Sequence, residues 1–578
     1  MVNADCLFVR LNICFEVASR NQPTGSIFGL AEFLTAVAIL AAAYSISDER
    51  YKFRIAVSAV PLPQVFFWTT TVVGVGIVLV KLWFDLALPI PRFANSPQYF
   101  ESVFALSFVL PISFWIYVGF ISPPIFKSRN AMKFARQTFS LLSNGNETQL
   151  TAVAQEIGRS AYAIVAIARR RVKRRNLHIG GISIEMPLEA KVASDLILML
   201  GDRRLCRAIA IHVPWVAAEI FRCVAKDGLD DIPLAQFSRN VARELFNNTD
   251  SAIHHEGDGF RSGLLGYTKP VSRELFGHAD LINELARRGG SPLEHIWLDT
   301  DSWNQVSWRT YGRAGLMFLE NHLNRSLNRN HSYAASQIFH TFTHACIDAY
   351  KINAMGDGYG ESIEYRKIEI TIEFVEKSLE LLEKYHVEAP QKQPADQRFN
   401  DFFDNLAEIA FELLISVASI NSPDWKNWQI QNNMYWMPLM QGFDDTRAWR
   451  IFRSRLQRKI YREVRNMDRY LNYKGARVLS VCLNVMGLSE EHEAHRPPEY
   501  RALKRLILRW IAKNYLRMRE ELPDAAAACL GGTISFDVTR QCLVKTYSAG
   551  LSREPAREYL TLDGFKAANS LGGQPSGA

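Results

Sequence analysis

The segments IFGLAEFLTAVAILAAAYSI (27–46), VFFWTTTVVGVGIVLV (65–80) and SVFALSFVLPISFWIYVGFISPPIF (102–126) decide the fold of this chain. The first contains one charged residue, Glu32, and the other two contain none. Hydrocarbon offers no partner to a backbone N–H or C=O, so a single spanning element must be a helix of about 20 apolar residues. The sequence therefore predicts three transmembrane helices in a membrane block over residues 25–127. Glu32 is costly in lipid and is expected to face another helix or an aqueous path.

Basic residues in the short loops predict how these helices are oriented, because Lys and Arg next to a span are retained on the cytoplasmic side. Apart from Lys81 at the end of the second segment, only Arg92 lies between the second and third segments, whereas the first and third segments are each followed by a basic group. These groups are Arg50, Lys52 and Arg54, and Lys127, Arg129, Lys133 and Arg136. We therefore expect a multi-pass protein of the inner (plasma) membrane, with the N-terminal segment 1–24 outside and the bulk of the chain in the cytoplasm.

The composition of the rest of the chain predicts a large globular part. The chain has 578 residues, of which 48% are hydrophobic and 22% charged, with a formal net charge of +8. After residue 127 the charged and apolar residues are interspersed, as in a globular cytoplasmic region. The eight cysteines stand singly, without CxxC or paired spacing, so we expect no zinc ribbon, iron–sulfur site or disulfide framework.

Periodic apolar residues after the membrane block predict a mainly α-helical region that ends in a small β meander. Helices are expected over most of residues 128–522, including Ser332–Ala354 and Asp445–Asn472, where apolar residues recur at three- and four-residue spacing. The strands are expected at 533–538, 541–547 and 558–562, and a short hairpin around Gly180 and Gly181. The expected parts are a basic juxtamembrane region (128–180), a helical subdomain (181–390), a second helical subdomain with the strands (398–565) and a disordered tail (566–578). A linker rich in proline and polar residues, 387–397, separates the two subdomains.

The end of the first helix after the membrane block carries a dense basic cluster. Its members are Arg169, Arg170, Arg171, Lys173, Arg174 and Arg175. So many cations near a membrane predict binding to anionic lipid headgroups, at about 1 kcal/mol per basic residue. Nucleic acid is an alternative partner, bound through its phosphates because no sequence-reading motif is present.

A second basic surface is predicted on the helix over 445–472. One side of this helix is apolar, from Trp449 to Leu471, and the opposite side carries Arg455, Arg458, Arg462 and Arg465. Like charges one helical turn apart repel, so the stripe predicts an anionic partner such as lipid headgroups, nucleic acid or an acidic protein. The alternative is that the glutamate-rich helix over 363–385 covers the stripe within the chain.

Two groups of residues could bind a divalent metal. His340, His344 and Asp348 lie at i, i+4 and i+8 of a predicted helix, where neighbouring members can chelate one ion but all three span about 12 Å. The alternative is an exposed face opposite the apolar side of that helix.

The second group lies in a glycine-rich loop over 247–270. His254, His255, Glu256 and Asp258 are suited to metal binding or to general acid–base catalysis. They suit an ordinary polar turn equally well.

These observations predict a membrane-tethered cytoplasmic binding, sensing or scaffold protein whose basic surfaces bind an anionic partner, without a cofactor. The alternative from another class is a membrane-anchored metal-dependent hydrolase that uses the His254/His255 loop or the His340/His344 helix. The phosphate-binding motif GxxxxGK[ST] and the hydrolase motif GxSxG are both missing from the sequence.

Overall fold

The computed structural model forms two compact units, Met1–Val241 and Ala242–Ala578, which we describe separately. Most of the described residues are helical, and the unit boundary falls within α10 (Ala235–Asn247). The structure describes residues 8–10, 13–17, 28–46, 48–92, 96–175, 187–229, 232–256, 261–262, 266–267, 270–294, 296, 298–325, 331–389, 401–421, 423–441, 446–489, 497–547 and 554–563.

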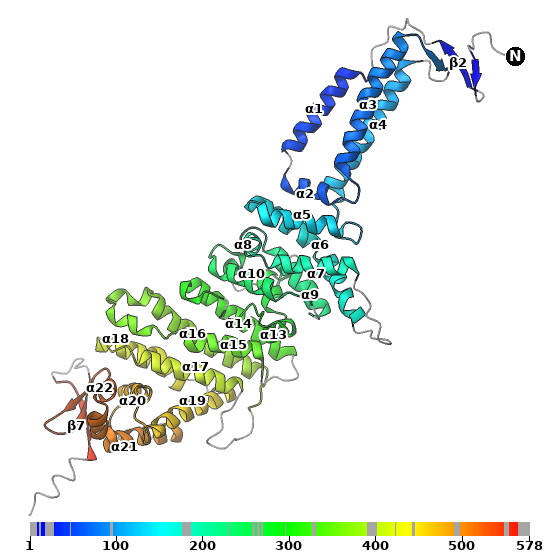
Figure 1. Cartoon of the computed structure of the whole chain (residues 1–578). Coiled ribbons are helices and arrows are strands. Elements are labelled where there is room, and N and C mark those ends of the chain that lie inside the picture. Colours follow the sequence, from blue (N-terminus) through cyan, green and yellow to red (C-terminus); the bar gives the residue numbers. More distant parts are fainter. Residues whose placement is uncertain are drawn as a thin grey trace, which may run out of the picture. The chain divides into compact units, whose positions relative to one another are not determined.

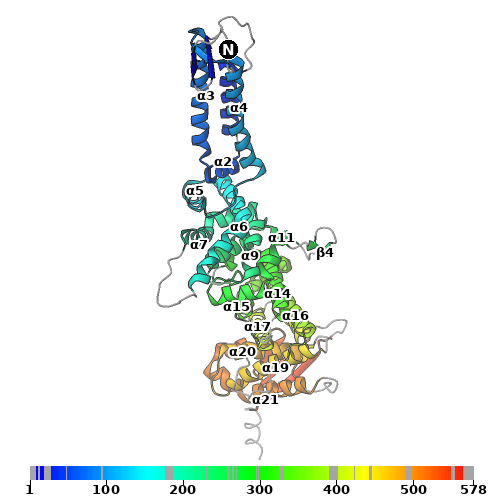
Figure 2. The same cartoon turned by 90° about the vertical axis from the view of Figure 1, so that its right-hand side faces the viewer.

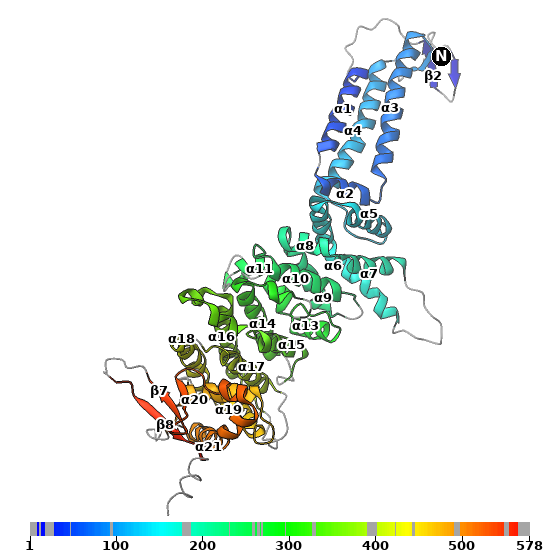
Figure 3. The same cartoon turned by 60° about the vertical axis from the view of Figure 1, so that its left-hand side comes forward.

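The first unit contains a group of long apolar helices. They are α1 (Leu30–Ile46), α3 (Leu62–Asp85) and α4 (Pro97–Ile116), which continues as the π-helical turn η2 (Tyr117–Ile121) (Figures 1 and 3). By length and composition, α3 with 24 residues and Pro97–Ile121 with 25 residues could each cross a membrane. At 1.5 Å per residue they reach about 36 Å, more than the roughly 30 Å of a hydrocarbon core. The third predicted span, α1, has 17 residues and falls short of the 18 residues that we require of a candidate span.

The apolar helices pack through a small aromatic core. It consists of Phe33, Val73, Ile77 and Phe108. Two glycines of α3 permit the close approach: a Cβ on Gly76 would lie 2.7 Å from the Phe104 ring of α4, and one on Gly74 would lie 3.0 Å from the Phe33 ring of α1. The outward faces stay exposed, with Phe67, Val72 and Leu106 each more than half accessible.

A small antiparallel sheet joins the N-terminal segment to the α3–α4 loop. Its strands are β1 (Phe8–Arg10), β2 (Ile13–Val17) and β3 (Pro89–Pro91), in that order. Cys14 on β2 is disulfide-bonded, and Cys6 lies outside the described residues. The sequence predicts no disulfide framework, and its cysteine spacing gives no sign of this bond, because the spacing rules find only closely paired cysteines.

Below the apolar helices the first unit continues as a layer of amphipathic helices. They are α2 (Glu49–Val57), α5 (Ala131–Asn144), α6 (Glu147–Arg175), α7 (Leu188–Leu200), α8 (Arg203–His212) and α9 (Trp215–Asp227). As a pair, α8 and α9 are apolar enough for one span, but they are bent by 107°. Their apolar residues, including Ile209 and Phe221, are buried, so the pair belongs to a protein core.

The second unit is a stack of helices around an aromatic core that includes Trp308, Tyr311 and Phe342. In it, α19, α20 and α21 pack against one another (Figure 2). Its α-helices are α11 (Ala252–His255), α12 (Pro270–Phe276), α13 (Ala279–Arg287), α14 (Gln305–Arg325), α15 (Tyr333–His344), α16 (Ile363–Lys384), α17 (Phe402–Val417), α18 (Asp424–Trp428), α19 (Arg447–Asn466), α20 (Tyr473–Met486), α21 (Pro498–Glu521) and α22 (Pro523–Ala528). Shorter elements are the 3₁₀ turns η4 (Thr300–Ser302), η5 (Ala349–Ala354) and η6 (Asp357–Glu361), the π-helix η7 (Gln429–Gln441) and the pair β4 (Arg261–Ser262) and β5 (Gly266–Tyr267).

The predicted C-terminal meander is confirmed. Strands β6 (Ile534–Asp537), β7 (Cys542–Thr546) and β8 (Arg557–Thr561) form an antiparallel sheet in the order β6-β7-β8. Just before it, Gly532 has φ +62°, and a Cβ there would lie 2.7 Å from the Asn484 side chain. Glycine is therefore required where the chain turns from α22 into the sheet.

The two units divide the chain differently from the predicted subdomains. The helices on either side of the expected linker, α16 and α17, pack against each other within the second unit. Residues 390–397 of that linker, the hairpin around Gly180 and Gly181, and the tail 566–578 lie outside the described residues.

Candidate functional site

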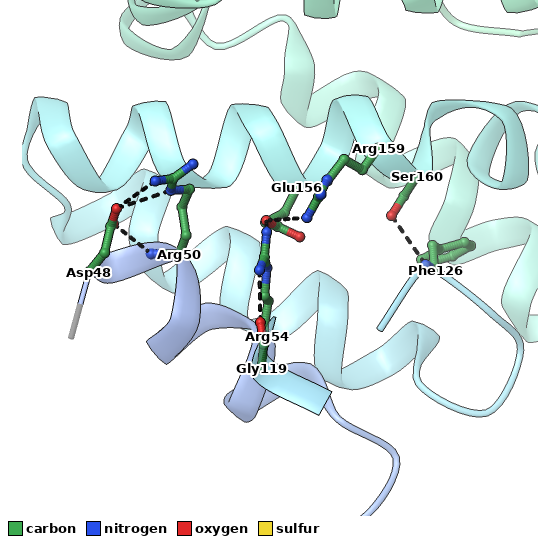
Figure 4. A network of polar contacts seen from close by, with 8 residues as sticks. All are labelled: Asp48, Arg50, Arg54, Gly119, Phe126, Glu156, Arg159 and Ser160. Carbon is green, nitrogen blue, oxygen red and sulfur yellow. Dashed lines mark hydrogen bonds and ion pairs between the residues drawn. The ribbon is translucent and has the colours of Figure 1, made fainter. Parts of the chain in front are cut away.

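A buried ion pair connects the apolar helices to the helical layer below them. Arg54 on α2 binds Glu156 on α6 through two nitrogens: Nε lies 2.8 Å and an Nη atom 2.7 Å from Glu156 Oε1 (Figure 4). Only 8% of the Arg54 side chain and 3% of the Glu156 side chain are exposed. A second cation, Arg159, approaches the same oxygen at 3.7 Å. Two opposite charges thus neutralise each other at a site that excludes water.

The same arginine also reaches the end of α4. Its other Nη atom donates a hydrogen bond of 2.8 Å to the carbonyl oxygen of Gly119, within the π-helical turn η2 (Figure 4). Carbonyls at a helix C-terminus lack partners within the helix and carry partial negative charge, so a guanidinium stabilises them. Arg54 therefore joins three elements, α2, η2 and α6, in one hydrogen-bonded group, which we call the Arg54 junction.

Aromatic packing closes the Arg54 junction on one side. The rings of Phe53 and Phe126 each pack edge-on against Phe134 of α5, with centroids 5.2 and 5.6 Å apart. The backbone N–H of Phe126 donates to Ser160 Oγ on α6 (Figure 4). These contacts join α2 and α5 and bind the segment after η2 to α6, while Arg54 and Glu156 are themselves buried, so that loss of one partner is costly.

An open polar pocket of about 580 Å³ lies beside α2 and α6. Asp48 caps the first turn of α2 and binds Arg50 at 2.9 Å, and across the pocket His212 lies 3.0 Å from Glu147. The charged groups that line the pocket are thus already paired with one another. The Arg54 junction and the two ion pairs that line the pocket are suited to hold helices together. Removal of one of these charges would change how the helices are arranged.

The basic cluster at the end of α6 is only partly described. The helix backbone extends to Arg175, and the guanidinium of Arg169 donates to the carbonyl oxygen of Gly228. The side chains of Arg170, Arg171, Lys173, Arg174 and Arg175 lie outside the described part of the chain.

The apolar face predicted on α19 is confirmed, because Trp449, Phe452, Leu456, Ile460 and Val464 are all buried. The arginines of the opposite face differ from one another in burial. Arg455 is only 8% exposed, Arg458 and Arg462 are half-buried, and Arg465 is exposed and lies 3.8 Å from Asp468.

An acidic row on α17 meets this face of α19. Arg455 lies 3.5 Å from the buried Asp401, and Lys459 binds Asp404 and Glu408 at 3.2 and 2.6 Å. Burial raises the pKa of Asp401 and lowers that of Arg455, so each needs the other to remain charged. Acids of this chain therefore do cover Arg455, and they come from the start of α17 rather than from the 363–385 helix that the sequence suggests.

Two of the candidate residues in the 247–270 loop, His254 and Glu256, form hydrogen bonds that hold the fold together. Both ring nitrogens of the buried His254 are engaged, Nδ1 with Thr310 Oγ1 at 2.9 Å and Nε2 with the carbonyl oxygen of Leu245 at 3.1 Å. A carbonyl only accepts, so Nε2 carries a proton, and burial lowers the pKa of His254, which favours the neutral ring. Glu256 accepts from the first backbone N–H groups of α12 and caps that helix. His255 is exposed, and Asp258 lies outside the described residues.

The second set of metal candidates does not lie on one helix. Helix α15 ends at His344, so the predicted continuous helix to Ala354 is wrong beyond that residue. His340 and His344 are exposed as expected, with ring centroids 4.6 Å apart, while Asp348 binds Lys367 through both oxygens at 3.0 and 3.1 Å. Asp348 and His344 line an open pocket of about 400 Å³. Within the described ranges, no group of three or more His, Cys, Asp or Glu side chains could hold a metal ion.

One buried lysine has the pKa expected of a nucleophile. Burial lowers the pKa of Lys545 to about 8. Its amine donates to the backbone carbonyl of Asn484 and lies over the rings of Trp428 and Tyr547, with only 1% of the residue exposed. A substrate has no access to an enclosed amine, so Lys545 ties β7 to the end of α20.

The Arg54 junction was not predicted from the sequence. Nor was a row of cations on α21, which consists of Arg501, Arg505, Arg509, Lys513 and Arg517. Arg54 was noted only as a topology signal, because nothing in the sequence places it next to Glu156, 102 residues away. The α21 row, in contrast, could have been found by counting basic residues at four-residue spacing.

Comparison with known proteins adds no family: no family model, curated protein or solved structure matches the chain.

Proposed function

We propose that this protein is a membrane-tethered scaffold or sensing protein, in which three transmembrane helices hold a large cytoplasmic helical part that presents basic surfaces to an anionic partner. The observation that carries the proposal is the Arg54 junction. It links the end of an apolar helix to the first long helix of the following layer through one buried guanidinium. A change in the apolar helices would therefore be transmitted to α6, whose far end carries the basic cluster.

The exposed surface of α3 and α4 supports insertion in a membrane. Most of their exposed side chains are large and apolar, and soluble proteins rarely expose such a surface. Helix α1 packs against α3 and is the third span of the proposal, since a bilayer thins at modest cost around a short helix.

The cysteines support the proposed orientation. Disulfides persist on the oxidising, outer side of a membrane and are rare in the cytoplasm. The bonded Cys14 precedes the apolar helices, and six later cysteines are free and buried. They are Cys206, Cys223, Cys346, Cys482, Cys529 and Cys542.

Anionic lipid headgroups are the partner that we propose for the cluster at the end of α6. Replacement of Arg170, Arg171, Arg174 and Arg175 by glutamine removes four cations, each worth about 1 kcal/mol near an anionic surface. With the full chain in nanodiscs of neutral lipid, we expect the variant to lose co-flotation with phosphatidylserine vesicles, and its residual binding to be less sensitive to salt.

The matched control replaces four exposed cations outside the cluster, each of which pairs with an acid one helical turn away. They are Arg222, Arg287, Arg288 and Lys377. This control should bind the vesicles like the unmodified protein. Equal binding by all three proteins would leave the cluster as a topology signal only and refute the proposed lipid contact.

A further inference from the structure

Helix α21 carries a regular row of cations. The row consists of Arg501, Arg505, Arg509, Lys513 and Arg517, one residue in every four. No acidic residue occurs between Tyr500 and Arg519. A spacing of four residues places each member about one turn above the previous one, with a rise of about 6 Å and a drift of about 40° around the helix, so the row covers about 24 Å along the axis.

The row lies on the outer side of α21. Arg505, Arg509 and Lys513 are exposed, and the two end members are half-buried. The opposite side of the helix, including Leu503, Ile507 and Ile511, is buried in the core. The row therefore winds gradually across the outer half of a helix that cannot rotate without exposing its core face.

The row has no acidic partner in the part of the chain that the structure describes. None of its members forms an ion pair there, and the Nε atoms of Arg501 and Arg517 lack a hydrogen-bond partner. One acid from a packed segment, Asp468, accepts a hydrogen bond of 2.7 Å from Trp510 and pairs with Arg465. Neighbouring members of the row repel each other by a few tenths of a kcal/mol per pair, which an external anion would relieve.

The surroundings of the row distinguish between classes of polyanion. A juxtamembrane basic cluster such as that of α6 can bind headgroups by charge alone, whereas a helix that inserts in a membrane surface presents an exposed apolar face. A protein interface needs buried aromatic or aliphatic anchors. No large hydrophobic residue of α21 is exposed. Binding to a phosphate backbone requires only regularly spaced cations.

We propose that the α21 row binds the phosphate backbone of nucleic acid without reading its sequence. The inference rests on the proposed function, which requires basic surfaces with an anionic partner. It deepens that function by naming nucleic acid as the partner at α21. It is independent of the lipid contact proposed for α6.

The test measures binding of the full chain in neutral nanodiscs to a labelled 30-base-pair DNA duplex and to an RNA of the same length between 50 and 200 mM salt. The variant Arg505→Gln, Arg509→Gln, Lys513→Gln removes three phosphate contacts, so the slope of log affinity against log salt should become shallower by about 2.7. Over this fourfold change in salt, the unmodified protein should lose about 40-fold more affinity than the variant.

The matched control, Arg287→Gln, Arg288→Gln, Lys377→Gln, makes the same change in net charge at exposed residues that already have acidic partners. It should retain the full salt slope. If the variant had the same salt slope as the unmodified protein, the inference would be overturned. It would also be overturned if the variant lost binding to phosphatidylserine vesicles or polyglutamate but still bound nucleic acid. The α6 cluster is intact in all of these proteins. If the unmodified protein binds vesicles but not nucleic acid, the inference about the α21 row is wrong, while the proposed lipid contact of α6 is unaffected.

Discussion

Arg54 shows how one side chain can serve two purposes in a protein that we propose to span a membrane. On the chain it is one of the basic residues that follow the first apolar segment, a position that fixes orientation. In the fold the same guanidinium is buried between Glu156 and the carbonyl of Gly119. Removal of one charge from a buried pair leaves the other without compensation, which is far more costly than loss of an exposed pair.

The first prediction follows from this difference. Arg54→Gln should lower the stability of the first unit by about 3 to 5 kcal/mol, because Glu156 stays buried with only Arg159 nearby. Arg50→Gln, which breaks the half-exposed pair with Asp48, should cost less than about 1 kcal/mol. Thermal unfolding of the full chain in detergent measures both.

A double variant separates charge from shape. Arg54→Met with Glu156→Met removes both charges and should recover much of the loss, since no uncompensated ion remains. Equal melting temperatures for the Arg54 and Arg50 single variants would show that the Arg54 junction is not a strong link.

At the scale of the element, α19 is a helix whose basic residues have different roles. Its inner cations meet the acids of α17, and its outer end is exposed. A single helix can thus contribute to the core of the second unit and still offer charge to a partner.

The second-unit prediction compares two arginines of this helix. Arg455→Gln leaves Asp401 buried without its cation, so the free energy of unfolding should fall by about 3 to 5 kcal/mol. Arg465→Gln should change it by less than about 0.5 kcal/mol, because that side chain is exposed. Urea unfolding of the two variants checks this, and a similar small effect in both would mean that the pair with Asp401 does not contribute.

The sequence was a good guide to elements with a strong period and a poor guide to contacts between them. The apolar face of α19 and the three C-terminal strands could be predicted, because burial of one side imposes a visible spacing. The partner of Arg455 could not, since α17 and the glutamate-rich α16 are both acidic and only packing decides which one faces α19. The end of α15 at His344 was missed for a related reason: the apolar period continues through Cys346 and Ala349 although the backbone tightens into 3₁₀ turns.

At the scale of the whole molecule, charge and cysteine chemistry change together along the chain. Before the apolar helices there is a disulfide-bonded cysteine; after them come the basic flanks and six free thiols. Both differences are expected if the apolar helices separate an oxidising compartment from a reducing one.

The central claim is that the apolar helices cross a membrane and leave the later part of the chain in the cytoplasm. Reporter fusions after Phe93 and after Ser143, one on each side of α4, test it most directly. We predict that the fusion after Phe93 reports the outer side and the fusion after Ser143 reports the cytoplasm. Reporters that both lie on one side, or that lie on the reverse sides, would contradict the account.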